Sequence, residues 1–162
     1  VWDDKTYRGD AYATYAWAIY VAEVNVDPVT YVTTVEDFLA LQEAGKIIHP
    51  KMAEGQIEGG VAQAIGFSLY EDVVWREGVM ANHQMTNYIM PTSMDLPPIR
   101  VKFAQQKEPV GAARGPKGIG ELPMDGGGPA IANALSFAAG IDVKEIPIMP
   151  EATCKMWRNA DG

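Results

Sequence analysis

A single carboxylate at the end of a glycine-rich run is the most distinctive chemical feature of this 162-residue chain. Residues 115–121 read Gly-Pro-Lys-Gly-Ile-Gly-Glu. Glycine tolerates positive φ and lets the backbone come close to a ligand. A carboxylate presented on such a loop suits a general base. The alternative is a solvated glutamate on a plain surface loop, which is the more frequent case for loops in general.

The segment after Glu121 predicts a helix beside this loop. Three glycines at 126–128 are followed by a helix-like run from Pro129 that should end near Gly140, since glycine is common just past a helix C-terminus. A carboxylate next to a helix N-terminus is one way to place a base beside an anionic ligand. The loop 104–127 would be long for a compact domain, and such loops are usually functional or disordered.

A second motif surrounds Gln56, whose amide both donates and accepts hydrogen bonds. Pro50 opens the predicted helix, and an apolar stripe follows at helical spacing, formed by Met52, Ile57, Val61, Ile65 and Leu69. The same helix carries four glycines, at positions 55, 59, 60 and 66. Each costs up to about 1 kcal/mol relative to alanine. We therefore expect a helix or a ligand to pack closely against this backbone.

The remaining patterns predict an α+β fold, with a mixed, mostly antiparallel sheet packed against two main helices near 50–72 and 128–139. Alternating bulky residues indicate strands. The expected strands are 10–26 and 31–36 as a hairpin, a short hairpin within 73–80, a strand at 99–103 and a final short strand at 145–148.

Composition limits the function classes. The net charge of −8 argues against nucleic-acid binding. One cysteine, Cys154, excludes an internal disulfide and a cysteine-ligated iron–sulfur or zinc site held by this chain alone, and it favours a reducing, cytoplasmic setting. His49 and His83 are not spaced as a metal-binding pair, so we predict no metal ligand in the chain and a structural role for His49.

Taken together, the two motifs closely resemble the C-terminal part of the molybdopterin-binding subunit of the xanthine dehydrogenase/aldehyde oxidase family of molybdenum hydroxylases. Further stretches resemble family signatures and occur in the family's order: residues 9–15, 45–50, 87–92 and 129–134. The resemblance extends from about residue 9 to Glu151. One departure is the absence of the usual Asp-x-Gly within residues 36–45.

The resemblance implies roles for individual residues. Glu121 corresponds to the family's general base, and Gln56 to the glutamine that contacts the pterin. Lys117, Gly118, Ile119 and Gly120 are expected to pass close to the metal or pterin through backbone groups, with a solvated charge as the equally weighted alternative for Lys117. Arg114 is a weaker candidate for an anion or cofactor contact.

The resemblance also implies an oxidoreductase that hydroxylates an electron-poor carbon of an N-heterocycle or aldehyde with water-derived oxygen. The cofactor would be the molybdenum–pterin cofactor in a dinucleotide form, with iron–sulfur clusters and FAD on partner domains or subunits. Residues 1–162 would be the C-terminal portion of a larger molybdopterin-binding domain, either a fragment or a split subunit. Two alternatives stay open: reductive dehydroxylation of an aromatic thioester, and a metal-free structural or assembly piece.

Overall fold

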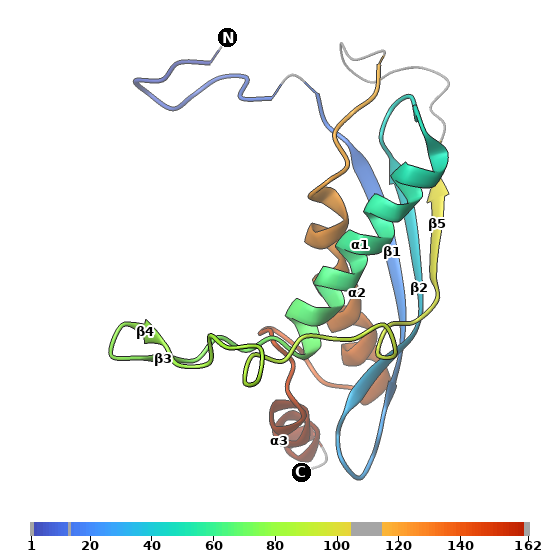
Figure 1. The fold of residues 1–162 in the computed structure, drawn as a ribbon. Coiled ribbons are helices and arrows are strands. Elements are labelled where there is room, and N and C mark those ends of the chain that lie inside the picture. Colours follow the sequence, from blue (N-terminus) through green and yellow to red (C-terminus); the bar gives the residue numbers. More distant parts are fainter. Residues whose placement is uncertain (1, 13, 105–114, 161–162) are drawn as a thin grey trace.

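A computed structural model describes residues 2–12, 14–104 and 115–160. The elements occur in the order β1 (Trp17–Val26), β2 (Thr33–Glu43), α1 (Pro50–Leu69), β3 (Trp75–Arg76), β4 (Val79–Met80), β5 (Ile99–Phe103), α2 (Leu122–Ala139) and α3 (Pro150–Ala160). Figure 1 shows the sheet formed by β1, β2 and β5 on one side and the helices α1 and α2 on the other.

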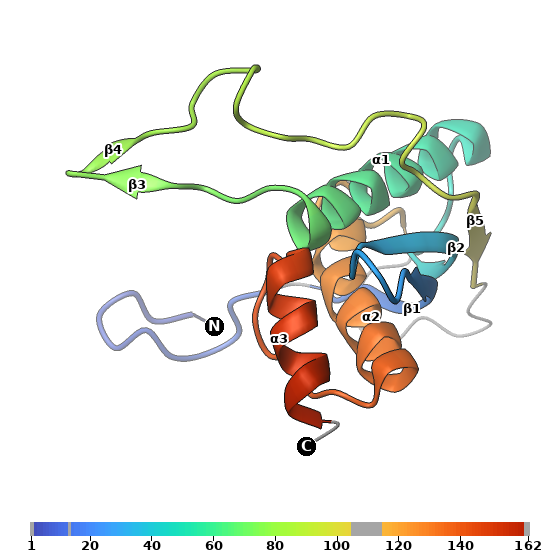
Figure 2. The same cartoon turned by 90° about the horizontal axis from the view of Figure 1, so that it is seen from below.

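The main sheet has the strand order β1-β2-β5. β1 and β2 form an antiparallel hairpin, whereas β5 pairs with β2 in parallel after the chain has crossed over through α1. Both helices cover the same face of the sheet, as the view from below shows in Figure 2. This mixed, mostly antiparallel sheet with helices on one face confirms the predicted α+β fold.

The core lies between the sheet and the two helices. Its fully buried large apolar side chains come from β2, α1 and α2, namely Phe38, Ile57, Ile65, Ile131 and Leu135. The predicted apolar stripe of α1 is confirmed for four of its members, because Ile57, Val61, Ile65 and Leu69 are buried. Met52 is the exception and is 68% exposed.

Glycines let α1 and α2 approach each other closely. A Cβ on Gly60 would lie 2.6 Å from Cβ of Pro123, and one on Gly127 would lie 2.4 Å from Cβ of Ala64. These pairs advance in the same sense along both helices, so α1 and α2 run in the same direction. Their N-termini therefore point towards the same end of the domain, but α2 begins beside the middle of α1, since Pro123 packs on Gly60. Segments 44–49 and 115–121 also lie at this end (Figure 1).

The boundaries of several elements differ from the sequence-based predictions. β1 begins at Trp17 rather than near residue 10, and β2 extends to Glu43. α2 begins at Leu122, so the glycines at 126–128 are helical. Sequence reasoning treated them as loop because glycine is a poor helix former. Here their lack of a side chain allows the close packing.

The predicted final strand at 145–148 is wrong. This segment joins no strand, although Ile148 is buried and its N–H donates to the carbonyl oxygen of Ser68 at 2.6 Å. The chain then forms α3, which was not predicted. Pro150 in its first turn, followed by Glu151, is a typical helix start and was the available signal.

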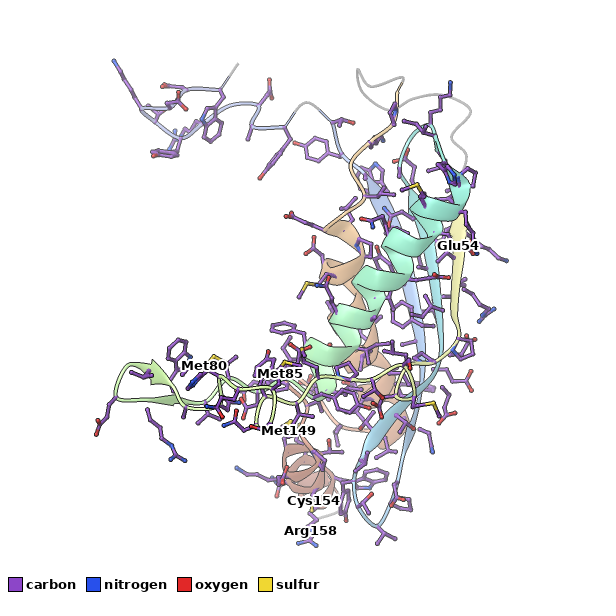
Figure 3. All side chains as sticks on the ribbon, viewed as in Figure 1. Glu54, Met80, Met85, Met149, Cys154 and Arg158 are labelled. Carbon is purple, nitrogen blue, oxygen red and sulfur yellow. The ribbon has the colours of Figure 1, made fainter. Side chains whose placement is uncertain are left out.

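Two segments extend away from the body of the domain. The first is the N-terminal arm before β1, and the second comprises the residues between α1 and β5 that carry the small β3–β4 hairpin (Figures 1 and 2). That hairpin was predicted within 73–80, and Gly78 at φ +79 supplies its turn. Met80 and Met85 lie on this second arm (Figure 3). Among the described residues, no helix is both long and apolar enough to cross a membrane.

Candidate functional site

A pocket of about 240 Å³ lies at the end of the domain where the two helices begin. Three segments line it: residues 44–49 after β2, the first turns of α1 and the beginning of the glycine-rich loop. Among the predicted site residues, Gln56, Lys117 and Ile119 contribute to its lining. The structure thus brings together two motifs that are far apart in the sequence, since Gln56 and Lys117 are 61 positions apart.

Gln56 lies on the exposed side of α1, and its side-chain amide makes no hydrogen bond with any other described residue. The glycines on this side, Gly55 and Gly59, have open space around them, since a Cβ added to either would meet no atom within 4 Å. Gly60 and Gly66 are used differently, because they face Pro123 and Pro91 within the chain. The chain itself therefore provides the predicted close packing at Gly60 and Gly66, whereas the helix backbone beside Gln56 is uncovered.

His49, the residue directly before α1, has a structural role, as predicted. Nδ1 of His49 accepts a hydrogen bond from the backbone N–H of Met52 at 3.2 Å and so caps the helix. Met52, which sequence periodicity assigned to the core, instead lines the pocket. Its position in the first turn puts it beyond the reach of α2.

The start of the glycine-rich loop is tied to the segment after β2. Lys117 donates its backbone N–H to the carbonyl oxygen of Ala44 at 2.9 Å, and Lys46 donates to that of Gly115 at 3.2 Å. Gly45 has φ +66, and a Cβ there would lie 2.3 Å from the Gly115 oxygen. A side chain at position 45 is thus excluded both by its backbone conformation and by the neighbouring strand-like segment.

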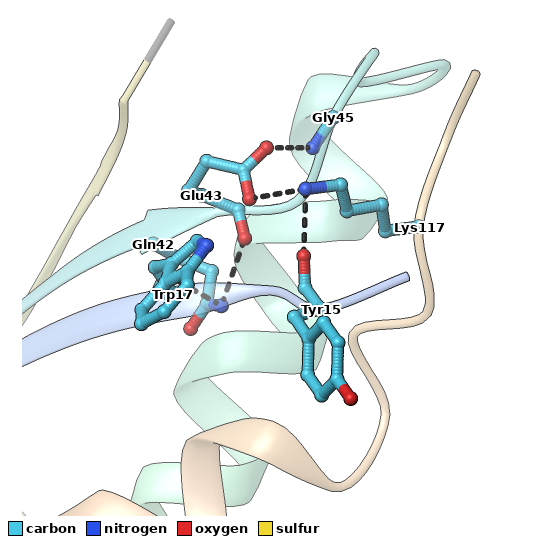
Figure 4. A network of polar contacts seen from close by, with 6 residues as sticks. All are labelled: Tyr15, Trp17, Gln42, Glu43, Gly45 and Lys117. Atoms are coloured by element: carbon cyan, nitrogen blue, oxygen red, sulfur yellow. Dashed lines mark hydrogen bonds and ion pairs between the residues drawn. The ribbon is translucent and has the colours of Figure 1, made fainter. Parts of the chain in front are cut away.

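A buried ion pair closes this connection (Figure 4). Nζ of Lys117 lies 2.7 Å from Oε2 of Glu43, and the two side chains are only 4% and 6% exposed. The same ammonium donates to the carbonyl oxygen of Tyr15 at 2.7 Å, while Oε1 of Glu43 accepts from the N–H of Gly45 at 2.8 Å. The Lys117 head group is therefore neither solvated nor free for a ligand.

Glu43 lies within residues 36–45, where the usual Asp-x-Gly is absent. It stands two residues before Gly45, and its carboxylate accepts a hydrogen bond from the Gly45 N–H. Its other oxygen, Oε2, accepts a hydrogen bond from Lys117. The sequence signal was the polar pair at the end of β2 after the apolar run 38–41, and sequence reasoning missed it.

A second polar layer lies beneath the ion pair. The fully buried Gln42 accepts from the Tyr20 hydroxyl at 2.7 Å and donates to the carbonyl oxygens of Trp17 and Glu43 at 3.3 and 3.2 Å. Burial, and then the negative charge of Asp125, raises the pKa of Tyr20 to about 12. The Tyr20 oxygen also lies 3.2 Å from the carbonyl oxygen of Leu122, the first residue of α2. Sequence reasoning did not identify this layer.

Glu121 occupies the position before the first turn of α2, and its side chain makes no capping hydrogen bond. It is exposed, so the described residues do not supply the apolar, water-poor surroundings expected for a base. Gly118 and Gly120 are exposed as well, and a Cβ on either would meet nothing within 4 Å. These three residues lie on the pocket's loop but not in its lining. Arg114 falls outside the described residues.

The donors at this end suit a polar organic group better than a bare metal ion. No three histidine, cysteine, aspartate or glutamate side chains gather into a possible metal site within residues 2–12, 14–104 and 115–160. What the pocket offers instead is the exposed Gln56 amide and the N-terminus of α1, with the exposed glycines 118 and 120 on the same loop outside its lining. Such groups fit a flat, hydrogen-bonding ligand with anionic substituents.

Comparison with known proteins places these features in a family. Residues 1–97 match the molybdopterin cofactor-binding domain. The chain is 35% identical over 139 residues to an aldehyde oxidoreductase molybdenum-binding subunit of Escherichia coli strain K12, covering 85% of this chain and 19% of that protein. It is 33% identical over 138 residues to a xanthine dehydrogenase molybdenum-binding subunit of Escherichia coli O157:H7, covering 84% and 18%.

A solved structure agrees with this match. The aldehyde oxidoreductase from Desulfovibrio gigas superposes with a TM-score of 0.80 at 29% identity, over 91% of this chain and 16% of that one. The chain thus spans less than a fifth of the relatives it matches. These relatives are molybdenum-binding subunits and an aldehyde oxidoreductase by name, and the predicted resemblance is confirmed. The chain belongs to the molybdopterin cofactor-binding domain family.

Proposed function

We propose that this chain is part of a molybdenum hydroxylase, in which it forms one wall of the cofactor site and supplies the general base Glu121. The observation that carries the proposal is the convergence of Gln56 with the loop 116–119 on one pocket at the end where α1 and α2 begin. Membership of a family that binds the molybdopterin cofactor supports the same assignment.

Each element of the pocket has a part in holding the cofactor. The Gln56 amide would pair with the hydrogen-bonding edge of the pterin, because it has no other partner among the described residues and offers both a donor and an acceptor. Gly118 and Gly120 would let the loop backbone come close to the ligand. The N-terminus of α1 would favour anionic substituents at this end.

Glu121 would act on the substrate side of this wall. Its position on the loop leaves the carboxylate free of hydrogen bonds to the helix it precedes, so it is available to accept a proton during hydroxylation. The cofactor, when bound, would supply Lewis acidity and redox capacity. The reaction we propose is oxidation of an electron-poor carbon of an N-heterocycle or aldehyde with water-derived oxygen.

The complete enzyme would contain further parts. One relative is named as the gamma subunit of the 6-hydroxypseudooxynicotine dehydrogenase complex, a protein that works in an assembly. By analogy we propose that this chain works with the rest of a molybdopterin-binding region and with iron–sulfur and FAD domains or subunits. We also propose a dinucleotide form of the cofactor and a cytoplasmic location.

Replacing the base tests the proposal. Glu121→Gln in the intact assembly should lower turnover by roughly 10²–10⁴-fold, the usual contribution of a general base, while molybdenum and pterin content stay at the wild-type level. Glu145→Gln is the matched control, since Glu145 is exposed and lies outside the pocket. Normal turnover in Glu121→Gln would remove Glu121 from the mechanism. Screening the active assembly with aromatic thioesters separates hydroxylation from reductive dehydroxylation.

A further inference from the structure

The loop between Lys117 and α2 has little stiffness of its own. Gly118 and Gly120 are exposed, and neither is confined by neighbouring atoms. Glu121 follows directly and makes no capping hydrogen bond. The position of its carboxylate is therefore set by the packing of Ile119 against the core and by the two points at which the loop is fixed, one on each side.

The downstream point is the start of α2. The carbonyl oxygen of Leu122 lies 3.2 Å from the Tyr20 hydroxyl. Pro123 is buried against Gly60, and Gly127 against Ala64. These contacts fix the helix immediately after Glu121 to both the sheet and α1.

The upstream point is Lys117. Its backbone N–H binds Ala44, and its side chain reaches back to Glu43 at the end of β2 and to Tyr15 before β1, both at 2.7 Å. One residue thus joins the loop to two other segments. Because the lysine head group is 4% exposed and both oxygens it contacts belong to the chain, its charge serves the fold and not a ligand.

We propose that Lys117 and Glu43 are positioning residues for Glu121: the buried ion pair holds the loop at the distance from the cofactor pocket at which the Glu121 carboxylate meets the substrate. This inference rests on the proposed function of Glu121. Its physical basis is that a displacement of about 1 Å at a reacting group can reduce the rate about 10²-fold. Among the described residues, no other side-chain hydrogen bond holds the segment 117–121, and the partly buried Ile119 adds packing against the core.

The test removes both charges at once in the complete, cofactor-loaded enzyme. The double variant Glu43→Gln/Lys117→Met leaves no unpaired charge in the interior, so the fold should survive. We expect kcat to fall by roughly 10–100-fold, with KM within about twofold and molybdenum content unchanged. Hydrogen–deuterium exchange at the amides of residues 118–121 should become faster.

Two further variants separate positioning from general destabilisation. Glu43→Asp alone keeps a carboxylate two residues before Gly45 and should therefore retain most of kcat. Asp37→Asn is the matched control, because it breaks the ion pair with Arg100 on the same sheet, where both side chains are more exposed. It should change neither kcat nor the exchange of residues 118–121.

The outcomes also distinguish this inference from the proposed function. If the double variant keeps wild-type kcat and exchange, or loses molybdenum instead of kcat, the positioning role is wrong. In a Glu121→Gln background, the double variant should accelerate exchange without lowering turnover further, because the base it positions is already gone. An additional loss of turnover there would also overturn the inference. Full activity of Glu121→Gln alone would overturn the assignment of Glu121 as the base. Faster exchange in the double variant would then still establish that the Glu43–Lys117 pair holds the loop.

Discussion

At the scale of single residues, the polar side chains at the pocket end fall into two groups. Gln42, Glu43 and Lys117 are buried, and each has hydrogen-bond partners within the chain. Gln56 and Glu121 are exposed, and their side chains have no hydrogen-bond partner among the described residues. Buried polar groups are costly unless satisfied, so the first group specifies the fold, while the second is the group to which we assign the ligand and substrate contacts.

The Gln56 amide gives the first prediction at this scale. Gln56→Ala should reduce the molybdenum and pterin retained by the purified assembly, because it removes hydrogen bonds worth about 0.5–1.5 kcal/mol each and hence several-fold in affinity. Gln63→Ala is the control, since Gln63 is exposed on the same helix but lies outside the pocket. Equal cofactor content in the two variants, measured by metal analysis and pterin fluorescence, would argue against a contact by Gln56.

Tyr20 gives a pH prediction. Because burial raises its pKa in the folded chain from 10.0 to about 12, the protonated phenol is favoured by folding. Its stabilising contribution is complete below pH 10 and is lost as the pH rises towards 12. Urea denaturation at several pH values should show a steeper decline over this range for the wild type than for Tyr20→Phe. Parallel curves would mean that Tyr20 does not carry the effect.

At the scale of elements, the site depends on how closely α1 and α2 pack. The start of α2 packs against the middle of α1 because Gly60 and Gly127 lack the side chains that would hold the helices apart. Gly126 serves the sheet in the same way, since a Cβ there would lie 2.1 Å from the Tyr20 ring. The glycines of α2 thus set the spacing between the helices and the sheet.

Alanine substitutions at a closely packed glycine and at an open glycine should have opposite effects on stability. Gly127→Ala should lower the free energy of unfolding by about 1–3 kcal/mol through overpacking against Ala64. Gly59→Ala should raise it by up to about 1 kcal/mol, because this helical position is exposed and open. Urea denaturation followed by circular dichroism measures both. Similar shifts in the two variants would contradict the packing explanation.

The sequence was sufficient for elements whose signals are local. The β1–β2 hairpin, the start of α1 at Pro50 and the end of α2 at Gly140 were predicted and are confirmed. The start of α2 was missed because its glycines are explained by close packing against α1, a contact that no local pattern of α2 contains. α3 was missed although Pro150 and Glu151 form a local start signal.

The candidate site shows the same limit. Gln56 and residues 117–121 were singled out from their motifs and from the family resemblance, and the structure brings Gln56, Lys117 and Ile119 to one pocket. The Glu43–Lys117 pair joins residues that are 74 positions apart. A pairing of this kind depends on where β2 ends relative to the loop, which no local pattern contains.

At the scale of the whole molecule, the chain leaves apolar surface uncovered. Trp17, Ile19 and Val21 of β1 are each more than half exposed. They alternate with Tyr20, which faces the helices, so they lie on the opposite face of the sheet. The arm between α1 and β5 adds exposed Trp75, Val79 and Met85. Exposed apolar patches of this kind mark an interaction face or drive self-association.

The isolated chain should therefore self-associate and bind a hydrophobic dye. Ile19→Thr/Val21→Thr should weaken both effects while keeping β-forming residues in β1. Val29→Thr is the control, because Val29 is exposed in the turn between β1 and β2 rather than on that face. Sedimentation and dye fluorescence are the measurements. A strictly monomeric chain that binds no dye would contradict this account of the exposed face.

The most direct test of the central claim is the molybdenum content of the native protein. The gene would be tagged in its own organism, the product purified, and both the assembly mass and the molybdenum per copy of this chain determined. The account predicts a large assembly with equimolar molybdenum. A small, metal-free species would contradict it, because the fold would then persist without the cofactor chemistry assigned to Gln56 and Glu121.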